Sequence, residues 1–350
     1  MPSPALAVIG AGRIGREHAR LINESRDATL GAIVDPEPAA RELAGSYGVP
    51  YFANHEDMLE NGGIAGAVVA LPNALHVPVA TDLVAHDLAV LVEKPIADTL
   101  ESAYLLVEAS RDASVPVLVG HQRRHSPDIA RARSCIVSGR LGRVVAVSGT
   151  CLMRKNDDYF DAGWRRAPGG GPILINLIHD IDALRFLLGE IVTVGALSSN
   201  QVRGLEVEDS AAVILNFASG AVGTLVLSDA VPAPWCWDLN SGKAPFFPYT
   251  PADCYLIGGT EASLAVPTME LLGAPGGGDW RSPLVHQRVP TDSSDPYENQ
   301  LRHFVDVVEG RAEPLIDAAD GMRTLAATLA VARSAETREL VRVDDLVPAE

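Results

Sequence analysis

The sequence predicts an α/β protein of two domains, an N-terminal doubly wound parallel sheet followed by an α+β domain with an open, largely antiparallel sheet. Three observations support this fold class. Short apolar strands alternate with helical segments from residue 5 to about residue 122. A glycine-rich turn joins the first strand to the first helix. Beyond residue 122 the strands are longer and alternate between apolar and polar residues, as antiparallel strands with one solvated face do.

The size and charge of the chain limit what it can be. With 350 residues it exceeds the usual size of one hydrophobic core, so we place two domains at 1–122 and 123–350. The formal net charge is −17, and the isoelectric point is near 4.9. This charge argues against nucleic acid and membranes as partners of the whole molecule.

The cysteines and the termini of the sequence bear on location and redox state. Cys135, Cys151, Cys236 and Cys254 lie far apart and form no CxxC pair, so we expect reduced thiols and no metal site. No secretory signal precedes the first strand, and no apolar run reaches the length of a transmembrane helix. We therefore expect a cytoplasmic protein.

The most informative motif is Gly10-x-Gly12-x-x-Gly15, between the apolar run 5–9 and the helical pattern 13–21. A strand, a turn and a helix form the context in which this motif binds a dinucleotide. Gly10 allows the tight turn, Gly12 lets the backbone approach a pyrophosphate, and Gly15 lets the helix pack on the strand. The motif therefore predicts a Rossmann domain.

Asp35 ends the second apolar run, 30–34, about 20 residues after the last glycine of the motif. A carboxylate in this position holds the 2′-hydroxyl of the adenosine ribose and repels a 2′-phosphate, which favours NAD over NADP. A structural glycine turn followed by an aspartate that caps the next helix is the alternative interpretation.

Lys94 is the next candidate functional residue. It follows the strand 89–92, at the edge of the sheet where open α/β folds bind ligands. Pro95 stiffens this turn, and a cis bond there would aim Lys94 at the crevice. By position alone, a surface lysine before a turn is an equal interpretation. The remaining elements of the first domain are expected as helices at 39–47, 77–85 and 103–110 and strands at 65–71 and 117–119.

The second domain is expected to contain strands at 144–151, 192–198, 210–217 and 221–228 and a helix at 321–337. Hairpin turns are expected at Ser219-Gly220 and Gly258-Gly259. The segment 231–253, rich in proline and aromatic residues, is expected to be a long ordered loop, either functional or packed under an interface. Its Trp235 and Trp237 could stack on a sugar or close an oligomer contact.

A second motif begins with three glycines, 169–171, and continues as a strongly apolar helix. Asn176, His179 and Asp180 lie on its other side. His179 is a candidate general base, and Asp182, three residues later, could orient its imidazole. A buried histidine satisfied by nearby backbone is the alternative.

Six motifs together resemble the Gfo/Idh/MocA family, named for glucose-fructose oxidoreductase, inositol dehydrogenase and rhizopine catabolism. They are Gly10-x-Gly12-x-x-Gly15 with His18, Leu71-Pro72-Asn73-x-x-His76, Glu93-Lys94-Pro95, Gly120-His121-x-Arg123-Arg124, the segment 169–182 and the segment 258–264. They occur in the family's order over nearly the whole chain. The resemblance implies NAD-dependent oxidation of a secondary hydroxyl of a sugar, inositol or related cyclic polyol. It also implies a homodimer or homotetramer that assembles through the C-terminal sheet.

The resemblance assigns roles to individual residues. Lys94 matches the active-site lysine and His179 the catalytic histidine. Cofactor contacts are expected at Gly10, Gly12, Arg13, Ile14, Gly15, Asp35, Leu71, Pro72, Asn73, His76, Glu93 and Lys94. Substrate contacts are expected at Lys94, Arg123, Trp164, Arg165, Asn176 and His179. Arg165 could bind a cofactor phosphate or a substrate carboxylate, and Trp164 could equally be a core residue.

One position departs from the family's pattern. Many inositol dehydrogenase-like members carry a catalytic aspartate four residues before the histidine, where this chain has Ile175. The neighbouring Asn176 cannot relay a proton, so the departure weakens an assignment to myo-inositol. Dehydrogenation of a non-sugar cyclic diol, net non-redox use of bound NAD, and a non-catalytic NAD-binding sensor remain as alternatives.

Overall fold

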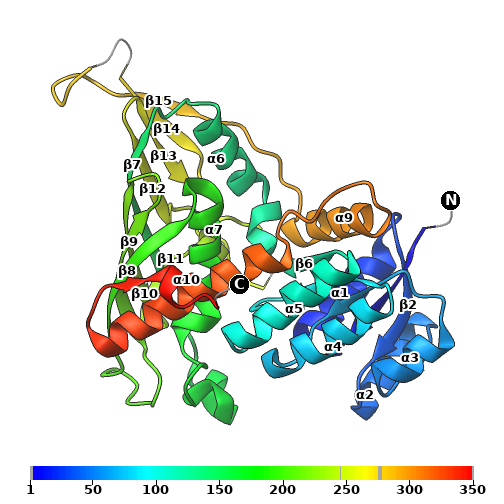
Figure 1. Cartoon of the computed structure of the whole chain (residues 1–350). Helices are drawn as coiled ribbons and strands as arrows, with labels where there is room; N and C mark the ends of the chain where they lie inside the picture. The colour runs from blue at the N-terminus through cyan, green and yellow to red at the C-terminus, as the bar shows by residue number, and fades with distance from the viewer. Residues whose placement is uncertain (1–2, 245, 275–277, 349–350) are drawn as a thin grey trace. The chain divides into compact units, whose positions relative to one another are not determined.

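The computed structural model describes all residues of the chain except 1–2, 245, 275–277 and 349–350. The chain forms two compact units (Figure 1). The described residues of the first unit fall within 1–122, 297–325 and 348–350, and the second unit comprises 123–296 and 326–347. Within the described part of the chain, no helix is both long and apolar enough to cross a membrane.

The first unit is built on a six-stranded parallel sheet with the order β3-β2-β1-β4-β5-β6. Its strands are β1 (Ala5–Ile9), β2 (Thr29–Val34), β3 (Tyr51–Phe52), β4 (Gly66–Val69), β5 (Ala89–Glu93) and β6 (Val117–Gly120). Its helices are α1 (Arg13–Glu24), α2 (Pro38–Tyr47), α3 (His55–Asn61), α4 (Asn73–Ala85), α5 (Leu100–Ala113) and, almost entirely, α9 (Pro296–Val308). The strand order reverses between β1 and β4, which is where ligands bind in such sheets. The predicted doubly wound sheet is confirmed.

The division of the chain differs from the expected 123–350 in one respect, because residues 297–325 pack with the first unit. The amide of Val119, on the edge strand β6, donates to Ile316 O at 2.9 Å. Tyr297 packs edge-on against His18, with 6.1 Å between the ring centroids. The returning chain therefore covers the free edge and adds a helix to the first unit, which local sequence patterns do not reveal.

The second unit contains a ten-stranded, mostly antiparallel sheet. Its order is β15-β14-β13-β12-β7-β10-β9-β8-β16, with β11 also paired to β7 and a parallel pair between β7 and β10. The strands are β7 (Val144–Arg154), β8 (Ile191–Ser199), β9 (Ser210–Phe217), β10 (Val222–Ser228), β11 (Ala230–Trp235), β12 (Tyr255–Gly259), β13 (Ala262–Val266), β14 (Glu270–Gly273), β15 (Val285–Arg288) and β16 (Val341–Arg342). The predicted open, largely antiparallel sheet is confirmed.

Helices cover one face of this sheet, as Figure 1 shows for α6 (Pro127–Val137) and α7 (Ile178–Leu188). The second half of α10 (Ala318–Thr337) also belongs to this unit, where Ser334 Oγ accepts from the Ala196 amide at 2.9 Å. The shorter elements are α8 (Trp237–Asn240) and the turns η1 (Gln122–His125), η2 (Asp157–Asp161), η3 (Gly163–Arg166), η4 (Ile173–Leu177) and η5 (Val343–Asp345). Along β9 and β10 buried and exposed side chains alternate, so the sheet has one core face and one open face.

Two expected turns and one expected loop can be compared with the structure. Gly220, with φ +83°, forms the turn between β9 and β10 as predicted. Gly258 and Gly259 instead end β12, and the hairpin turns at the next two residues. The expected loop 231–253 contains most of β11 and the helical turn α8, because an irregular edge pairing with β7 accommodates its prolines.

Candidate active site

The glycine motif lies between the carboxyl end of β1 and the N-terminus of α1. A Cβ on Gly15 would overlap the carbonyl oxygen of Gly10, so glycine is needed for α1 to pack this close to the turn. A Cβ on Gly12 would meet nothing within 4 Å. Among the described residues no side chain caps α1. Helix α1, which begins at Arg13, thus starts without a side-chain cap, and the first amides of such a helix are suited to bind a pyrophosphate.

Asp35 lies directly against this glycine turn. Its Oδ2 accepts from the Ala11 amide at 2.6 Å, and its Oδ1 accepts from the Glu37 amide at 2.8 Å. The Tyr51 hydroxyl donates to the Asp35 carbonyl at 3.0 Å and fixes the backbone there. The carboxylate thus lies beside the turn where a ribose diol is held in dinucleotide folds. The open helix terminus, the cradle at Gly12 and this carboxylate together fit NAD.

Lys94 follows β5, and the Lys94-Pro95 peptide is cis, as considered from the sequence. Glu93 is buried beside it and accepts from His18 Nε2 at 2.9 Å and from the Lys94 amide at 3.2 Å. Burial alone would raise the pKa of Glu93, but the hydrogen bond and charge of His18, together with Lys94, lower it below its usual value. Glu93 is therefore an anionic anchor for the turn that carries Lys94. The expected contact of Glu93 with the cofactor stays a prediction.

His76 links this turn to the end of β4. Its Nδ1 lies 2.8 Å from Pro95 O and its Nε2 lies 2.8 Å from Leu71 O. Burial is the main cause that lowers the pKa of His76, against the opposing effect of the two carbonyl groups. His76 is nearly inaccessible and supports the expected cofactor residues Pro72 and Asn73, which begin α4 at the carboxyl edge of the sheet.

In the second unit, the predicted helix carries Asn176 and His179, but its first turn is a π-helix, η4. Glu208 Oε1 accepts the Ile173 amide at 2.8 Å and holds this turn. A Cβ on Gly171 would overlap the Glu208 carboxyl group, so this glycine permits the contact. Burial raises the pKa of Glu208 above its usual value. π-Helical turns are rare and occur often at functional sites, and the sequence pattern does not distinguish this one from an α-helix.

Asp182 was expected to orient His179, but both of its carboxylate oxygens accept hydrogen bonds from Arg124 instead. Arg124 donates to them from Nε at 2.9 Å and from Nη2 at 2.7 Å, and both residues are buried. This bidentate pair holds α7 against η1. His179 is half-buried on the same helix.

Arg123 was expected to contact substrate, but its side chain is only 2% exposed. Its Nη1 donates to Asp180 at 2.8 Å and its Nη2 to Asp238 at 3.1 Å. Tyr255 also contacts both Arg123 and Asp180. Burial alone would lower the pKa of Arg123, but the charges of Asp238 and Asp180 raise it well above its usual value. The geometry therefore gives Arg123 a structural role and argues against the expected substrate contact.

The two tryptophans proposed to contact a ligand, Trp237 and Trp164, differ in burial. Trp237 is 1% exposed, and its indole donates to Asp128 Oδ2 at 2.8 Å, so it is a core residue and not a platform for a sugar. Trp164 is 56% exposed. The guanidinium of Arg165 lies 5.1 Å from the Trp164 ring and 3.9 Å from the Tyr159 ring. Trp164 and Arg165 thus remain available for a ligand.

One site residue was missed from the sequence. Lys155, directly after β7, donates from Nζ to Asn176 Oδ1 at 2.7 Å and lies 3.5 Å from Asp229 Oδ2. Its ammonium also lies 4.5 Å from the centroid of the Tyr159 ring. The sequence offers one sign of this role, since Lys155 follows a long predicted strand and precedes the aromatic segment 159–164. Only the fold shows that its side chain reaches Asn176.

Comparison with known proteins identifies the family. Residues 5–121 match the family described as an oxidoreductase family with an NAD-binding Rossmann fold, and residues 129–265 match the GFO/IDH/MocA C-terminal domain. The rhizopine catabolism protein MocA of Rhizobium meliloti is 30% identical over 249 residues, which are 69% of this chain and 76% of the relative. This chain belongs to the Gfo/Idh/MocA oxidoreductase family.

Other members of the Gfo/Idh/MocA family match over nearly the full length. An inositol 2-dehydrogenase of Rhizobium meliloti strain 1021 is 29% identical over 95% of this chain and 97% of its own. The crystal structure of a putative myo-inositol dehydrogenase from Sinorhizobium meliloti 1021 is 26% identical, with a TM-score of 0.75 over 97% of this chain and 100% of that one. An Agrobacterium radiobacter oxidoreductase, solved with NAD+, L-tartaric acid and magnesium, has a TM-score of 0.80 over 98% and 99% of the two chains at 22% identity, and shares the fold. The predicted family, enzyme class and NAD-binding Rossmann domain are confirmed.

Proposed function

We propose that this oxidoreductase oxidises a secondary hydroxyl of a sugar, inositol or related cyclic polyol. The observation that carries the proposal is the glycine turn with Asp35 and Lys94 at the carboxyl edge of one sheet, in a chain whose full-length relatives include an inositol 2-dehydrogenase. Other relatives, a scyllo-inositol 2-dehydrogenase of Bacillus subtilis and a D-apiose dehydrogenase of Rhizobium rhizogenes, act on the same chemical class by name.

The chain's own residues supply the proton chemistry. His179 accepts the proton of the substrate hydroxyl, since an unprotonated imidazole is a suitable base near neutral pH. Lys94, at the carboxyl edge of the first sheet, is the residue that would stabilise the negative charge that develops on a substrate oxygen. NAD, when bound at the glycine turn, would supply the hydride acceptor for the carbinol carbon, and the oxidised product would be a ketone.

We also propose that the enzyme prefers NAD to NADP. The support is the position of Asp35, whose carboxylate lies 2.6 Å from the Ala11 amide beside the glycine turn. A 2′-phosphate on the ribose would meet this negative charge at short range, whereas a 2′-hydroxyl would donate to it.

The test is to follow absorbance at 340 nm while the protein, with NAD+ or NADP+, meets inositols, aldoses, sugar acids and cyclic diols. The proposal predicts reduction of NAD+ by a sugar or polyol. If only a non-sugar cyclic diol reduces NAD+, the substrate belongs to that class and not to the sugars and polyols. No reduction across the panel, with NAD binding intact, would contradict the proposal and favour a sensor or a cycle without net oxidation.

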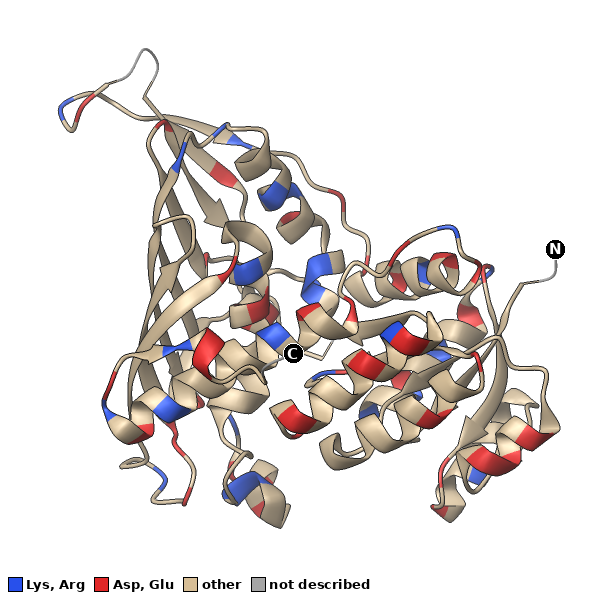
Figure 2. Ribbon diagram, viewed as in Figure 1, with Lys and Arg blue, Asp and Glu red and all other residues tan. Residues whose placement is uncertain are grey.

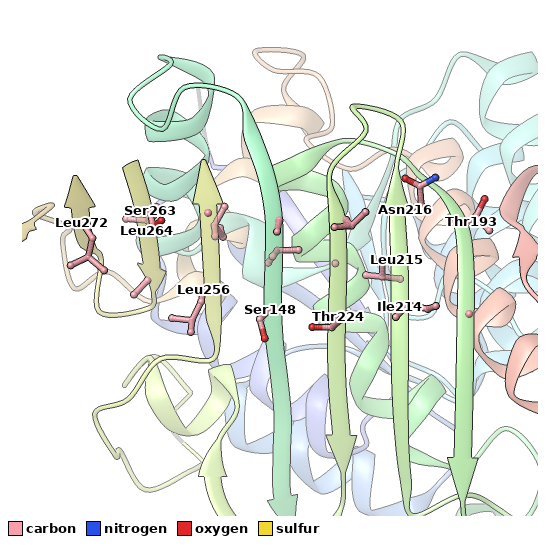
Figure 3. A pocket seen from close by; sticks show the side chains of 18 of the residues that line it. Ser148, Thr193, Ile214, Leu215, Asn216, Thr224, Leu256, Ser263, Leu264 and Leu272 are labelled. Atoms are coloured by element: carbon pink, nitrogen blue, oxygen red, sulfur yellow. The ribbon is translucent and has the colours of Figure 1, made fainter. Parts of the chain in front are cut away.

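We further propose that a second copy of this chain covers the open face of the C-terminal sheet. This face forms a shallow concavity of about 1010 Å³, and Figure 3 shows side chains such as Ile214, Thr224 and Leu256 standing on it. The strands β8, β9, β10 and β12 contain no charged residue, although the chain carries a net charge of −17. Figure 2 accordingly shows charged residues mainly on helices and loops.

An identical partner fits this face better than a charged one would. Two neutral apolar faces can pack as a sheet sandwich without bringing the excess negative charge of the two copies together. Leu197, Ile214, Val226 and Leu256 are all well exposed on this face, and exposed apolar side chains gathered on one face are typical of an interaction surface. The choice between a dimer and a tetramer, like the cytoplasmic location, stays a prediction.

A further inference from the structure

We propose that Lys155 is a positioning residue, which holds the amide oxygen of Asn176 so that this side chain offers only hydrogen-bond donors to the substrate. The inference rests on the proposed function for the statement that Asn176 contacts a substrate. The fixed orientation of the amide is argued from contacts within the second unit alone.

The main chain of Lys155 is fixed on both sides. Lys155 directly follows β7, and its amide donates to the Asp229 carbonyl at 2.8 Å. Its own carbonyl accepts from Arg203 Nη2 at 2.9 Å. Arg203 is bound in turn to the buried carboxylate of Asp229, with 3.1 Å between Nε and Oδ1. The point at which the lysine side chain begins therefore cannot move without breaking hydrogen bonds to two other segments of the chain.

The ammonium group of Lys155 is also held, and its charge is compensated. The side chain is 10% exposed, and Nζ lies 3.5 Å from Asp229 Oδ2 and 4.5 Å from the centroid of the Tyr159 ring. Burial raises the pKa of Glu208, and the charge of Lys155 is among the effects that oppose this rise, so a second carboxyl group acts on the same ammonium. The lysine therefore has its counter-charges within the protein, and its place does not depend on a ligand.

Asn176 accepts a hydrogen bond from this ammonium, with 2.7 Å between Lys155 Nζ and Asn176 Oδ1. Because an ammonium group has no acceptor, the amide must present its oxygen to the lysine, and its two N–H donors point elsewhere. Among the described residues no acceptor lies within hydrogen-bond distance of Asn176 Nδ2. The side chain is half-buried, as is that of His179, and residues three apart are neighbours on a helix. The donors of Asn176 thus lie beside the candidate base.

The fixed amide restricts which substrate groups can bind beside His179. A free asparagine can turn its amide over and so either donate or accept. With its oxygen held by Lys155, Asn176 can only donate. The substrate must therefore offer an acceptor at this position, such as a hydroxyl, a ring oxygen or a carbonyl, whereas a protonated amino group has no acceptor and would be rejected.

The first measurement is steady-state kinetics at 340 nm with the substrate that the panel identifies. Lys155→Met keeps a long side chain but removes its donor, and it should raise KM for the substrate about 10-fold with little change in kcat or in KM for NAD+. Lys155→Arg keeps a cationic donor and should restore most of the affinity. Arg154→Met, at the exposed preceding residue, is the matched control and should change neither constant.

A double-mutant cycle separates positioning from a direct contact or a purely structural role. Asn176→Leu removes the amide and should itself raise KM about 10-fold. If Lys155 acts through Asn176, Lys155→Met should add less than about 2-fold to KM in the Asn176→Leu background. Losses that multiply in the double variant would show that Lys155 acts by another route and would overturn the inference.

Nuclear magnetic resonance tests the orientation of the amide without turnover. The protein is labelled on asparagine with the heavy nitrogen isotope, and the side-chain resonances of Asn176 are identified by their absence in Asn176→Leu. They should be sharp in the wild type, broaden in Lys155→Met as the amide exchanges between two orientations, and sharpen again in Lys155→Arg. Circular dichroism checks the fold of each variant.

The two readouts distinguish this inference from the proposed function. If no sugar or polyol is oxidised but the Asn176 resonances broaden in Lys155→Met, the positioning by Lys155 stands and the proposed oxidation fails. If a polyol is oxidised but these resonances stay sharp and KM is unchanged in Lys155→Met, the inference is overturned and the proposed function stands.

Discussion

At the scale of single residues, the proposed preference for NAD rests on the position of Asp35. Its two oxygens accept amides of Ala11 and Glu37, so the carboxylate cannot turn away from the glycine turn without losing both hydrogen bonds. Asp35→Ser removes the charge that holds a ribose hydroxyl and repels a phosphate. We expect KM for NAD+ to rise about 10- to 100-fold and activity with NADP+ to appear. Steady-state rates with both cofactors measure the change. The control is Glu37→Gln, and an unchanged ratio of the two activities in Asp35→Ser would contradict the assignment.

His76 gives a prediction for pH. Because burial lowers its pKa below the ordinary value of 6.5, the unfolded chain takes up this proton at a higher pH than the folded protein. The free energy of unfolding should therefore decrease as the pH falls from about 6.5 toward the lowered pKa, by up to about 1.4 kcal/mol per pH unit. His76→Gln should remove this part of the pH dependence.

Urea unfolding at pH 7.5, 6.5 and 5.5 measures the effect of His76, because the difference between wild type and variant isolates one group. His86→Gln, at the exposed end of α4, is the control. If His76→Gln and wild type lose stability in parallel as the pH falls, the buried histidine does not cause the loss.

At the scale of elements, the π-helical turn η4 depends on a carboxyl group from elsewhere in the chain. Glu208 accepts the Ile173 amide, so Glu208→Ala leaves this amide without its partner and should cost about 1–3 kcal/mol of unfolding free energy. Activity should fall as well, because the turn carries Asn176. Glu208→Gln keeps an acceptor oxygen and removes a charge that burial disfavours, so its stability should equal or exceed that of the wild type.

Thermal and urea unfolding, with kcat/KM, distinguish the two substitutions of Glu208. The exposed Glu206, two residues earlier, provides Glu206→Ala as the control. Equal losses in the alanine and glutamine variants would show that the charge, and not the acceptor, holds the turn.

Much of the element pattern could be predicted because it depends on local periodicity. The apolar strands of the first sheet and the helix that carries His179 follow directly from residue spacing. The π-turn and the contact between Lys155 and Asn176 could not be predicted, because both depend on side chains that are distant in sequence. The burial of Arg123 could not be predicted for the same reason, because a charged residue in a family motif gives no local sign that it will pair with Asp180 and Asp238.

At the scale of the whole molecule, the open sheet face predicts self-association. Ile214, at the centre of β9, faces outward opposite Thr224 of β10. Ile214→Glu together with Thr224→Glu would place four carboxylates in the contact of two copies, and the oligomer should dissociate. Light scattering after size-exclusion chromatography measures the mass, with Arg166→Gln as a surface control. A wild type that is monomeric at micromolar concentration would contradict the second copy as the occupant of this face.

The division into units was only partly predictable at this scale. The pattern of apolar residues changes near residue 122, where the parallel strands end, and the sequence therefore predicted this boundary. The return of residues 297–325 to the first unit depends on the free edge of β6, which accepts Ile316 as a partner for Val119. Such a long-range pairing leaves no periodic trace in the sequence.

The central claim is that this chain oxidises a hydroxyl group with Lys94 and His179 as catalytic residues. The most direct test is to measure kcat of Lys94→Met and of His179→Ala for the substrate found in the panel, with NAD+ binding measured in every variant. We predict that each variant binds NAD+ and loses about 10²- to 10⁴-fold in kcat. Turnover that survives in either variant would contradict the account.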